Sequence, residues 1–466
     1  MTTPASIHFG TDGWRAVIGD DFTFANVRRV ADAAGRVLAA DHPGGTVLIG
    51  YDTRFEASAF AAAVAEVLAS HGLTVRVSNA YCPTPALCWS VSRNEDAVGG
   101  VMLTASHNPA PYLGFKLRMA DGGASPVSFT DRVEAALSDE PPTARGTFET
   151  FDLVGPYLAE LVGFVDGELI RAAGLKVAVD PLFGAGRSYL AQTLRSLGVE
   201  VTELHGEANP GFGGLHPEPI PPHIDEARGF VRDHGLDAAF ITDGDADRIG
   251  AADRSGAFVN PHRILALVAQ HLIQDRGMSG RIVKTLSTSV IVDRIAAVLG
   301  APVTTTPVGF KWIYEEMAKG DVLLGGEESG GIGVPAHVRE RDGLLMSLLL
   351  AEMMAQRGCG LGELVDDLLA ITGPMEYGRV DLRLDAAVKD AFVASWPTLS
   401  LAEVAGLPVR ETVRVDGIKF LLPDDGWLLM RASGTEPLVR IYAEASTTDE
   451  VQRLLAFGRA LAETAG

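Results

Sequence analysis

A threefold repeat of one strand–helix–strand pattern constrains the fold of this 466-residue chain more than any other feature. In each copy, an apolar strand is followed by a loop, a helix, a glycine and an alternating strand. The first strands are expected at residues 46–50, 176–180 and 281–284, and the helices end before Gly72, Gly198 and Gly300. Glycine is favoured there because a helix C-terminus often needs a left-handed residue. Strands that alternate with helices predict parallel βαβ units, here in three related α/β domains.

Each copy then reaches a further apolar strand, at residues 97–103, 238–242 and 322–325. A compact polar loop follows each of these strands. The loops read TASHNP at residues 104–109, DGDADR at 243–248 and GEESGG at 326–331. In open parallel sheets, ligands bind beyond the carboxyl ends of the strands. The three loops are therefore predicted to belong to functional sites.

The C-terminal part of the chain does not continue the repeat. Strands are expected at residues 407–418, 420–422, 427–431 and 439–445, followed by a helix over 448–463, which predicts an α+β domain. The expected domains are residues 1–151, 152–253, 254–372 and 373–466.

Composition and charge exclude several classes of protein. The 39 basic and 60 acidic residues give a net charge of −21, which disfavours a nucleic-acid partner. The three cysteines, Cys82, Cys88 and Cys359, form no CxxC motif, so neither a disulfide scaffold nor a zinc ribbon is expected. No signal peptide is evident, and the apolar segment 344–355 is too short to span a membrane. A cytoplasmic protein with reduced thiols and no membrane partner is the expectation.

Three carboxylates lie within five residues of the second loop: Asp243, Asp245 and Asp247. Two carboxylates 4 Å apart repel by about 4 kcal/mol at an effective dielectric of 20, so such a cluster needs either solvent or a cation. Oxygen ligands of this kind suit Mg²⁺. An EF-hand is excluded, because Arg248 and Arg254 stand where that loop needs Gly and Glu. The alternative is a solvated acidic turn, but the position after a buried strand favours metal binding.

Ser106 lies in the first loop without a GxSxG motif, which argues against a serine hydrolase. A lone serine after a strand is usually a turn or cap residue. A serine hydroxyl can also carry a phosphoryl group as a covalent intermediate. Beside an acidic metal loop, Ser106 becomes a candidate for phosphoryl transfer.

A fourth polar loop, RASGTEP at residues 431–437, combines a guanidinium group with hydroxyls and glycine. Such groups are typical of a phosphate-binding site, although an exposed turn is the alternative. The residues that would form this site are Arg431, Ser433, Gly434, Thr435 and Arg440.

Together with FGTDGWR at residues 9–15, these four loops resemble the α-D-phosphohexomutase superfamily, in the phosphoglucomutase/phosphomannomutase family. Order and spacing match over essentially the whole chain. The resemblance implies three related α/β domains and a smaller α+β domain around a central cleft. These would carry, in chain order, the phosphoserine loop, the metal site, the sugar site and a phosphate site. It further implies a cytoplasmic enzyme, monomeric or homodimeric, that acts on a small sugar phosphate.

The resemblance also assigns roles to residues. Ser106 would carry the phosphoryl group, and a phosphoserine oxygen would bind Mg²⁺ together with the three aspartates. Glu327 and Ser329 would hold sugar hydroxyls, and the fourth loop would grip the phosphate that is not transferred. Arg15, Lys116 and Arg248 would surround the reacting phosphoryl group, and His107 would be a further catalytic residue. Lys116 is the first candidate acid or base, His337 is the second, and Gly309 and Lys311 would also contact substrate.

The implied mechanism passes through a bisphosphate. Phospho-Ser106 would donate its group to a hexose monophosphate, and the resulting glucose 1,6-bisphosphate, which also serves as activator, would turn around in the cleft. Ser106 would then recover the other phosphate. Phosphoryl transfer of this kind depends mostly on positioning and charge stabilisation.

Three positions bear on the sugar and on the local geometry. Gly331 stands where the phosphomannomutase and phosphoglucosamine mutase branches have His, and Glu328 resembles glucose-preferring members. Leu113 stands where the family often has Asn. We expect a phosphoglucomutase, with a phosphomannomutase or broad-specificity phosphohexomutase as the alternative. A metal-dependent phosphatase would need no second phosphate site, and a non-catalytic sugar-phosphate sensor would need neither Ser106 nor the complete acidic loop.

Overall fold

The computed structural model describes residues 7–10, 12–432 and 437–464 of the chain. Its first sheet has six strands in the order β1-β5-β4-β2-β3-β6. The strands are β1 (Trp14–Val17), β2 (Thr46–Tyr51), β3 (Thr74–Ser78), β4 (Ala97–Leu103), β5 (Tyr112–Met119) and β6 (Glu149–Phe151). The helices of this part are α1 (Phe24–Asp41), α2 (Ala57–Ser70), α3 (Thr84–Arg93) and α4 (Val127–Ala135).

The second sheet has five strands in the order β11-β10-β9-β7-β8. They are β7 (Lys176–Asp180), β8 (Glu200–Glu203), β9 (Ala238–Thr242), β10 (Ile249–Asp253) and β11 (Phe258–Val259). The accompanying helices are α5 (Val154–Phe164), α6 (Gly167–Ala173), α7 (Tyr189–Ser196), η1 (Phe212–Gly214) and α8 (Asp225–His234). Because β11 pairs with β10, this sheet extends to Val259, beyond Asp253.

The third sheet has four strands in the order β13-β12-β14-β15. They are β12 (Arg281–Thr285), β13 (Val303–Thr306), β14 (Val322–Gly326) and β15 (Ile332–Gly333). Its helices are α9 (Pro261–Gln270), the π-helix η2 (His271–Asp275), α10 (Ile291–Leu299), α11 (Phe310–Met317), α12 (Gly343–Arg357) and α13 (Leu361–Thr372).

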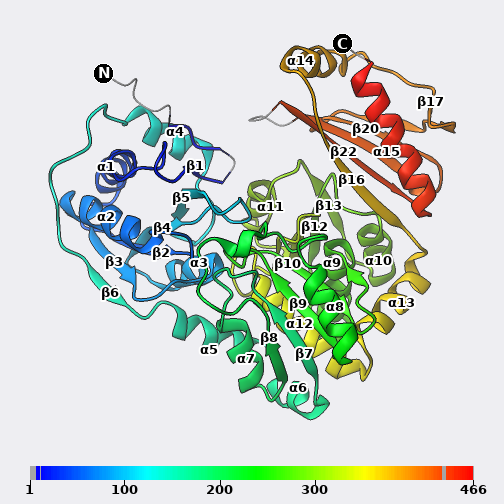
Figure 1. Cartoon of the computed structure of the whole chain (residues 1–466), viewed down its shortest axis with the longest axis horizontal. Helices are drawn as coiled ribbons and strands as arrows, with labels where there is room; N and C mark the ends of the chain where they lie inside the picture. The colour runs from blue at the N-terminus through cyan, green and yellow to red at the C-terminus, as the bar shows by residue number, and fades with distance from the viewer. Residues whose placement is uncertain (1–6, 11, 433–436, 465–466) are drawn as a thin grey trace.

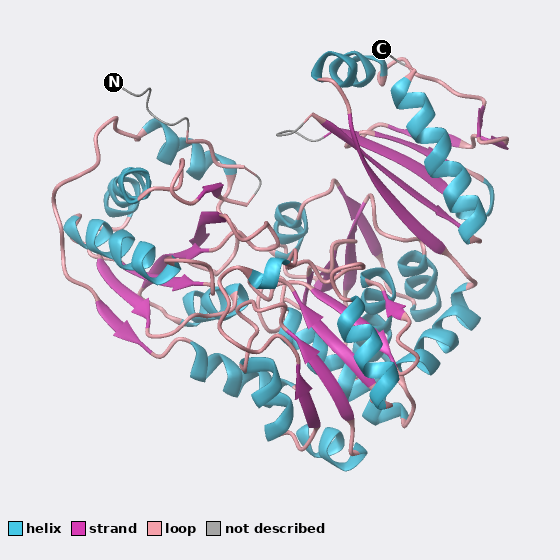
Figure 2. Cartoon of the chain, viewed as in Figure 1, coloured by secondary structure: helices cyan, strands magenta, loops and turns pink. Residues whose placement is uncertain are grey.

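The predicted repeat is confirmed by the pairing of the strands. In each of the three sheets, the first strand of the repeat pairs in parallel with both later strands: β2 with β3 and β4, β7 with β8 and β9, and β12 with β13 and β14. The loops that follow β4, β9 and β14 gather in the middle of the molecule, where Figure 2 shows a dense group of loops between the sheets.

The second and third sheets share one hydrophobic core, which contains α12 and extends to residues of β2, α3 and β4. The α12 helix is buried from Gly343 to Met354 and contacts α6, α9 and β10, and Figure 1 places it between the two sheets. The apolar segment that is too short to span a membrane is thus part of a buried helix. In the described part of the chain, no helix is both long and apolar enough to cross a membrane.

The C-terminal sheet is antiparallel, with the order β16-β22-β21-β20-β19, and α15 (Thr448–Glu463) packs against it (Figure 1). Its strands are β16 (Glu376–Arg383), β19 (Glu411–Val413), β20 (Ile418–Leu421), β21 (Trp427–Ala432) and β22 (Leu438–Ala445). The remaining elements are α14 (Ala386–Ser395), a two-stranded ribbon of β17 (Glu403–Val404) and β18 (Leu407–Pro408), and the short helix η3 (Pro423–Asp425).

The prediction of one continuous strand over residues 407–418 is wrong. The segment contains β18, β19 and the start of β20. A turn at Gly417, whose φ is +102°, reverses the chain so that β19 pairs antiparallel with β20. The other C-terminal strands and the final helix lie close to their expected positions.

Candidate active site

Ser106 lies in the loop between β4 and β5 and is only 1% exposed. Its φ is +49°, a left-handed conformation that is uncommon for a residue other than glycine. The hydroxyl donates a hydrogen bond to Asp243 Oδ2 at 2.8 Å, and His107 Nδ1 lies 3.5 Å from the same hydroxyl oxygen. The loops of the first and second sheets that were singled out in the sequence are therefore in direct contact.

The acidic loop connects β9 to β10, and its three aspartates are fully buried. Each offers a carboxylate oxygen, and these oxygens lie within 4.8 Å of one another. Asp245 Oδ1 and Asp247 Oδ1 are buried without a hydrogen-bond partner among the described residues. Unpaired buried carboxylate oxygens that converge on one point fit a hard cation such as Mg²⁺. The alternative of a solvated acidic turn does not agree with this burial.

The pKa shifts of the three aspartates indicate that their carboxylates repel one another when no cation is bound. Burial, Asp247 and Asp245 together raise the pKa of Asp243 well above its usual range. Burial likewise raises the pKa of Asp247 to about 6, against the opposing effect of Arg341. Burial also acts to raise the pKa of Asp245, but Lys116 and Thr84 outweigh it and lower that pKa. A divalent cation would relieve this repulsion and favour the charged form of all three.

Gly244 allows the acidic loop to approach the Ser106 loop. A Cβ atom at this position would overlap the carbonyl oxygen of Ser106, so that the two loops would have to separate. The glycine between Asp243 and Asp245 is thus needed for the close contact of the hydroxyl with the carboxylate.

Cationic side chains from several elements surround these two loops. Arg15, in β1, donates to Asn108 Oδ1 at 2.6 Å and lies 3.7 Å from Asp12. Arg248 follows the acidic loop directly, and its Nε lies 3.9 Å from Asp243 and 3.8 Å from Asp247. The structure therefore brings both predicted arginines to the site.

Lys116 is fully buried on β5 and forms two ion pairs. Its Nζ lies 2.8 Å from Asp12 and 3.0 Å from Asp245. Burial acts to lower the pKa of Lys116, but Asp12 and Asp245 outweigh it and raise that pKa. The ammonium group therefore stays charged, which suits charge stabilisation and proton donation rather than proton abstraction.

Two residues of the site were not predicted from the sequence. Besides Arg15, Asp12 pairs with Lys116, Arg118 and Arg341, so one carboxylate joins four cations. Arg341 precedes α12 and lies 2.7 Å from Asp247 and 3.9 Å from Glu327. Arg341 therefore connects the acidic loop to the loop expected to bind sugar. Asp12 lies within the FGTDGWR segment, whereas no sequence motif pointed to Arg341.

Gly331 is adjacent to Arg341. A Cβ atom at Gly331 would overlap Arg341 Cδ, and Gly331 also forms a backbone bridge with Arg248. The place that a side chain at position 331 would take is thus occupied by the Arg341 side chain.

The loop after β14 places Glu327 in a buried position. Its Oε1 accepts a hydrogen bond from the backbone N–H of Gly309 at 3.0 Å, so two predicted substrate residues are in contact. Burial raises the pKa of Glu327 to about 7, against the effect of Arg341. Ser329 is partly exposed on the same loop.

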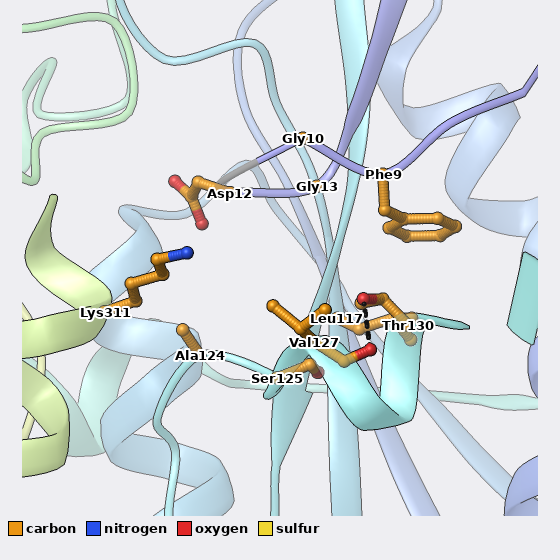
Figure 3. Close-up of a pocket in the computed structure, with 10 residues that line it drawn as sticks. All are labelled: Phe9, Gly10, Asp12, Gly13, Leu117, Ala124, Ser125, Val127, Thr130 and Lys311. Atoms are coloured by element: carbon orange, nitrogen blue, oxygen red, sulfur yellow. Dashed lines mark hydrogen bonds between the residues drawn. The ribbon is translucent and has the colours of Figure 1, made fainter. Parts of the chain in front are cut away.

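A cavity of about 180 Å³ lies beside Asp12, between the N-terminal segment, β5, the start of α4 and α11. Figure 3 shows Lys311, from α11, pointing toward Asp12 at its edge. Lys311 also lies over the Trp312 ring, 4.7 Å from its centre.

Arg431 and Arg440 are opposite residues on the neighbouring strands β21 and β22. Like charges that face each other across a sheet are unfavourable, so the pair suits an anionic ligand. Asp416 binds Arg431 at 2.9 Å and accepts the backbone N–H of Val308 at 2.8 Å, which ties this sheet to the third. Ser433, Gly434 and Thr435 lie outside the residues that the structure describes.

His337 makes no described hydrogen bond, ion pair or ring contact with the Ser106 loop. It is buried, its Nε2 lies 3.1 Å from Asp342 Oδ2, and its ring contacts Tyr157 and Phe164. These described contacts link the third domain to α5 and give His337 a packing role. They do not support the expected role of His337 in proton transfer.

The chain matches sequence models of all four domains of one family. The matched descriptions are "Phosphoglucomutase/phosphomannomutase, alpha/beta/alpha domain I" over residues 6–143, domain II over 155–256, domain III over 260–371 and the C-terminal domain over 386–460.

Individual relatives carry different sugar names. A "Phosphoglucomutase/phosphomannomutase" of Thermococcus kodakarensis is 32% identical over 463 residues, with 98% of each chain covered. A "Phosphoglucosamine mutase" of Frankia casuarinae is 34% identical, with 94% of each covered. The crystal structure of a putative phosphomannomutase from Thermus thermophilus is 40% identical with a TM-score of 0.89, over 99% of this chain and 100% of that one.

Proposed function

Because this chain belongs to the phosphoglucomutase/phosphomannomutase family, whose members are intramolecular phosphotransferases, we propose that it interconverts glucose 1-phosphate and glucose 6-phosphate. The observation that carries the proposal is the 2.8 Å hydrogen bond from Ser106 to Asp243, which joins a candidate phosphoryl carrier to a candidate metal site. Neither a binding protein nor a serine hydrolase needs this combination.

In this proposal, Ser106 Oγ carries the phosphoryl group. The bond between Ser106 Oγ and phosphorus breaks as a bond forms between phosphorus and the free hydroxyl oxygen of the hexose monophosphate. The hydroxyl loses its proton and Ser106 Oγ gains one. The product is glucose 1,6-bisphosphate, and after it turns around, the reverse transfer restores phospho-Ser106 and releases the isomer.

The surrounding charges support such a transfer, which depends on stabilising negative charge rather than on covalent chemistry by other groups. Arg15, Lys116 and Arg248 supply positive charge next to the Ser106 loop. Asp243, Asp245 and Asp247 would hold Mg²⁺ together with a phosphoserine oxygen, and the bound ion would neutralise charge on the phosphoryl oxygens. Lys116, charged through its pairs with Asp12 and Asp245, is the proposed proton donor.

Substrate contacts are assigned to the third and fourth domains. Glu327 and Ser329 are proposed to bind sugar hydroxyls that serve both orientations, with Gly309 and Lys311 nearby. Arg431 and Arg440, with the predicted residues of the 433–435 segment, are proposed to hold the phosphate that is not transferred. The division into residues 1–151, 152–253, 254–372 and 373–466 belongs to this proposal, as do a cytoplasmic location and a monomeric or homodimeric state.

The preference for glucose is the finer part of the proposal. It is supported by Glu328 and by Gly331, since Arg341 fills the space beside Gly331 that a His would need. We expect kcat/KM for glucose 1-phosphate to exceed that for mannose 1-phosphate by about tenfold, which requires about 1.4 kcal/mol of differential transition-state binding. The alternative, a phosphomannomutase or broad-specificity phosphohexomutase, is favoured by the 40% identity to a putative phosphomannomutase.

The deciding experiment measures turnover of glucose, mannose and glucosamine 1-phosphates, each with its catalytic bisphosphate and Mg²⁺. The proposal expects glucose 1-phosphate to be the best substrate. Equal or reversed values for mannose would favour the alternative. Release of inorganic phosphate without isomerisation would indicate a phosphatase.

A further inference from the structure

We propose that Arg54 is a positioning residue that holds the Ser106 loop in the geometry required for phosphoryl transfer, an inference that rests on the proposed role of Ser106 as phosphoryl carrier. Arg54 lies in the loop after β2, and it donates a hydrogen bond to the carbonyl of Ser106, which lies 52 residues further along the chain. Its side chain is completely buried.

Every N–H group of the Arg54 guanidinium has an acceptor. The Nε donates to Asp52 Oδ2 at 3.1 Å. The four remaining donors bind the backbone carbonyls of three residues of the Ser106 loop and of the first residue of β5. These are Ser106, Asn108, Pro109 and Tyr112, at 2.6, 2.6, 2.8 and 2.9 Å. A guanidinium has five N–H donors in a fixed planar arrangement, so these contacts define the shape of the loop and leave no donor free.

The loop needs such support because Ser106 has a φ of +49°. A left-handed conformation at a residue other than glycine is unfavourable unless its surroundings maintain it. Arg54 binds the Ser106 carbonyl, and the Ser106 N–H donates to Thr104 Oγ1 at 2.9 Å. With both sides of the residue fixed, Ser106 Oγ is directed at Asp243.

The other face of Arg54 contacts the domain that carries the acidic loop. The guanidinium lies over the ring of Phe212, 4.8 Å from its centre, and Phe212 is fully buried. Asp52 accepts a second hydrogen bond, from the Arg54 backbone N–H at 2.9 Å, which keeps the side chain in place. Arg54 therefore lies between the Ser106 loop and a segment of the second domain, where it also fixes the loop relative to that domain.

The test compares Arg54→Lys with Arg29→Lys. Lysine keeps the charge of Arg54 but cannot bind four carbonyls and a carboxylate at once. Arg29 is a matched control, because it is also buried in the first domain and donates to a backbone carbonyl, that of Ser138, away from the Ser106 loop. For each protein, the melting temperature, the affinity for glucose 1-phosphate and the rate at which glucose 1,6-bisphosphate phosphorylates Ser106 in a single turnover are measured.

We expect Arg54→Lys to be phosphorylated about 100-fold more slowly than the wild type, because displacement of a reacting group by about 1 Å has an effect of this size. Its affinity for glucose 1-phosphate should change by less than about threefold, as for a residue that acts on the transfer step. Arg29→Lys should be phosphorylated at the wild-type rate. Asp52→Asn weakens the hydrogen bonds that hold Arg54 and should slow phosphorylation by about tenfold. If Arg54→Lys does not fold, Asp52→Asn provides the test in its place.

The outcomes separate this inference from the proposed function. If the wild type is never phosphorylated at Ser106, the proposed function fails and the inference fails with it. If the wild type is phosphorylated but Arg54→Lys and Asp52→Asn react at its rate, only the positioning role is overturned. Equal slowing in Arg54→Lys and Arg29→Lys would also overturn it, since the effect would then follow stability.

Discussion

The hydroxyl of Ser106 donates to Asp243 across 2.8 Å, although 137 residues separate the two in the chain. The contact joins the loop after β4 in the first sheet to the loop after β9 in the second. A phosphoryl group on Ser106 would therefore lie next to the carboxylates that could hold a cation, and the first two domains would together form the proposed reaction centre.

Removal of divalent metal should abolish turnover, and added Mg²⁺ should restore it. Asp245→Asn should lower kcat by about 100-fold and raise the Mg²⁺ concentration needed for half-maximal rate, because a charged ligand is lost from the cluster. Asp233→Asn, at an exposed position of the same domain, is the control and should behave as the wild type. Full activity of the wild type in excess chelator would contradict the metal site.

Glu327 should make the protein less stable as the pH rises. In the folded protein its pKa is raised from 4.5 to about 7 by burial, so between these values the folded state holds a proton that the unfolded state has lost. The stabilisation of the neutral form is complete below pH 4.5 and is lost progressively up to about pH 7.

Glu327→Gln removes this titration. Relative to the variant, the wild type should lose roughly 2–3 kcal/mol of unfolding free energy between about pH 5 and pH 8. Urea unfolding with chelator present, followed through the transition of the second and third domains, measures the difference. A difference that does not change with pH would show that Glu327 ionises normally in the folded protein.

Gly331 and Arg341 should be energetically coupled. Gly331→Ala places a methyl group against Arg341 and should destabilise the protein by about 1–3 kcal/mol, the usual range for overpacking. Once Arg341→Ala has removed the obstructing side chain, the same change should be nearly neutral.

A double-mutant cycle of thermal stability measures this coupling. Arg341→Ala alone should also lower activity, because Asp247 and Asp12 lose a cationic partner. Strictly additive effects of the two substitutions would contradict the steric explanation for the glycine.

The sequence predicted the parts of the site that follow the repeat. Ser106, Asp243 and Glu327 each lie in a loop that directly follows a strand of the repeat. Because ligands bind beyond the carboxyl ends of parallel strands, each of these loops could be expected to belong to a functional site. Residues that reach the site from other places could not be found in this way. Arg341 precedes a buried helix and Arg54 follows β2, and neither belongs to a recognisable motif.

The errors of prediction have similar causes. His337 was expected as a second acid/base candidate, and its described contacts are instead with Asp342 at the start of α12 and with α5, which no local pattern indicates. The apolar pattern over residues 407–418 looked continuous, although the turn at Gly417 and the ribbon of β17 and β18 divide it. The local sequence pattern carries no information on the tertiary contacts that determine these features.

The most direct test of the account is the covalent state of Ser106. The purified protein is incubated with glucose 1,6-bisphosphate and Mg²⁺, digested, and analysed by tandem mass spectrometry, and Ser106→Ala is treated in parallel. We expect one phosphoryl group, located on Ser106. Ser106→Ala should fold normally and lose at least about 10³-fold in turnover, the scale expected for loss of a nucleophile. An unmodified Ser106 peptide in a fully active enzyme, or near-normal turnover by Ser106→Ala, would contradict the account.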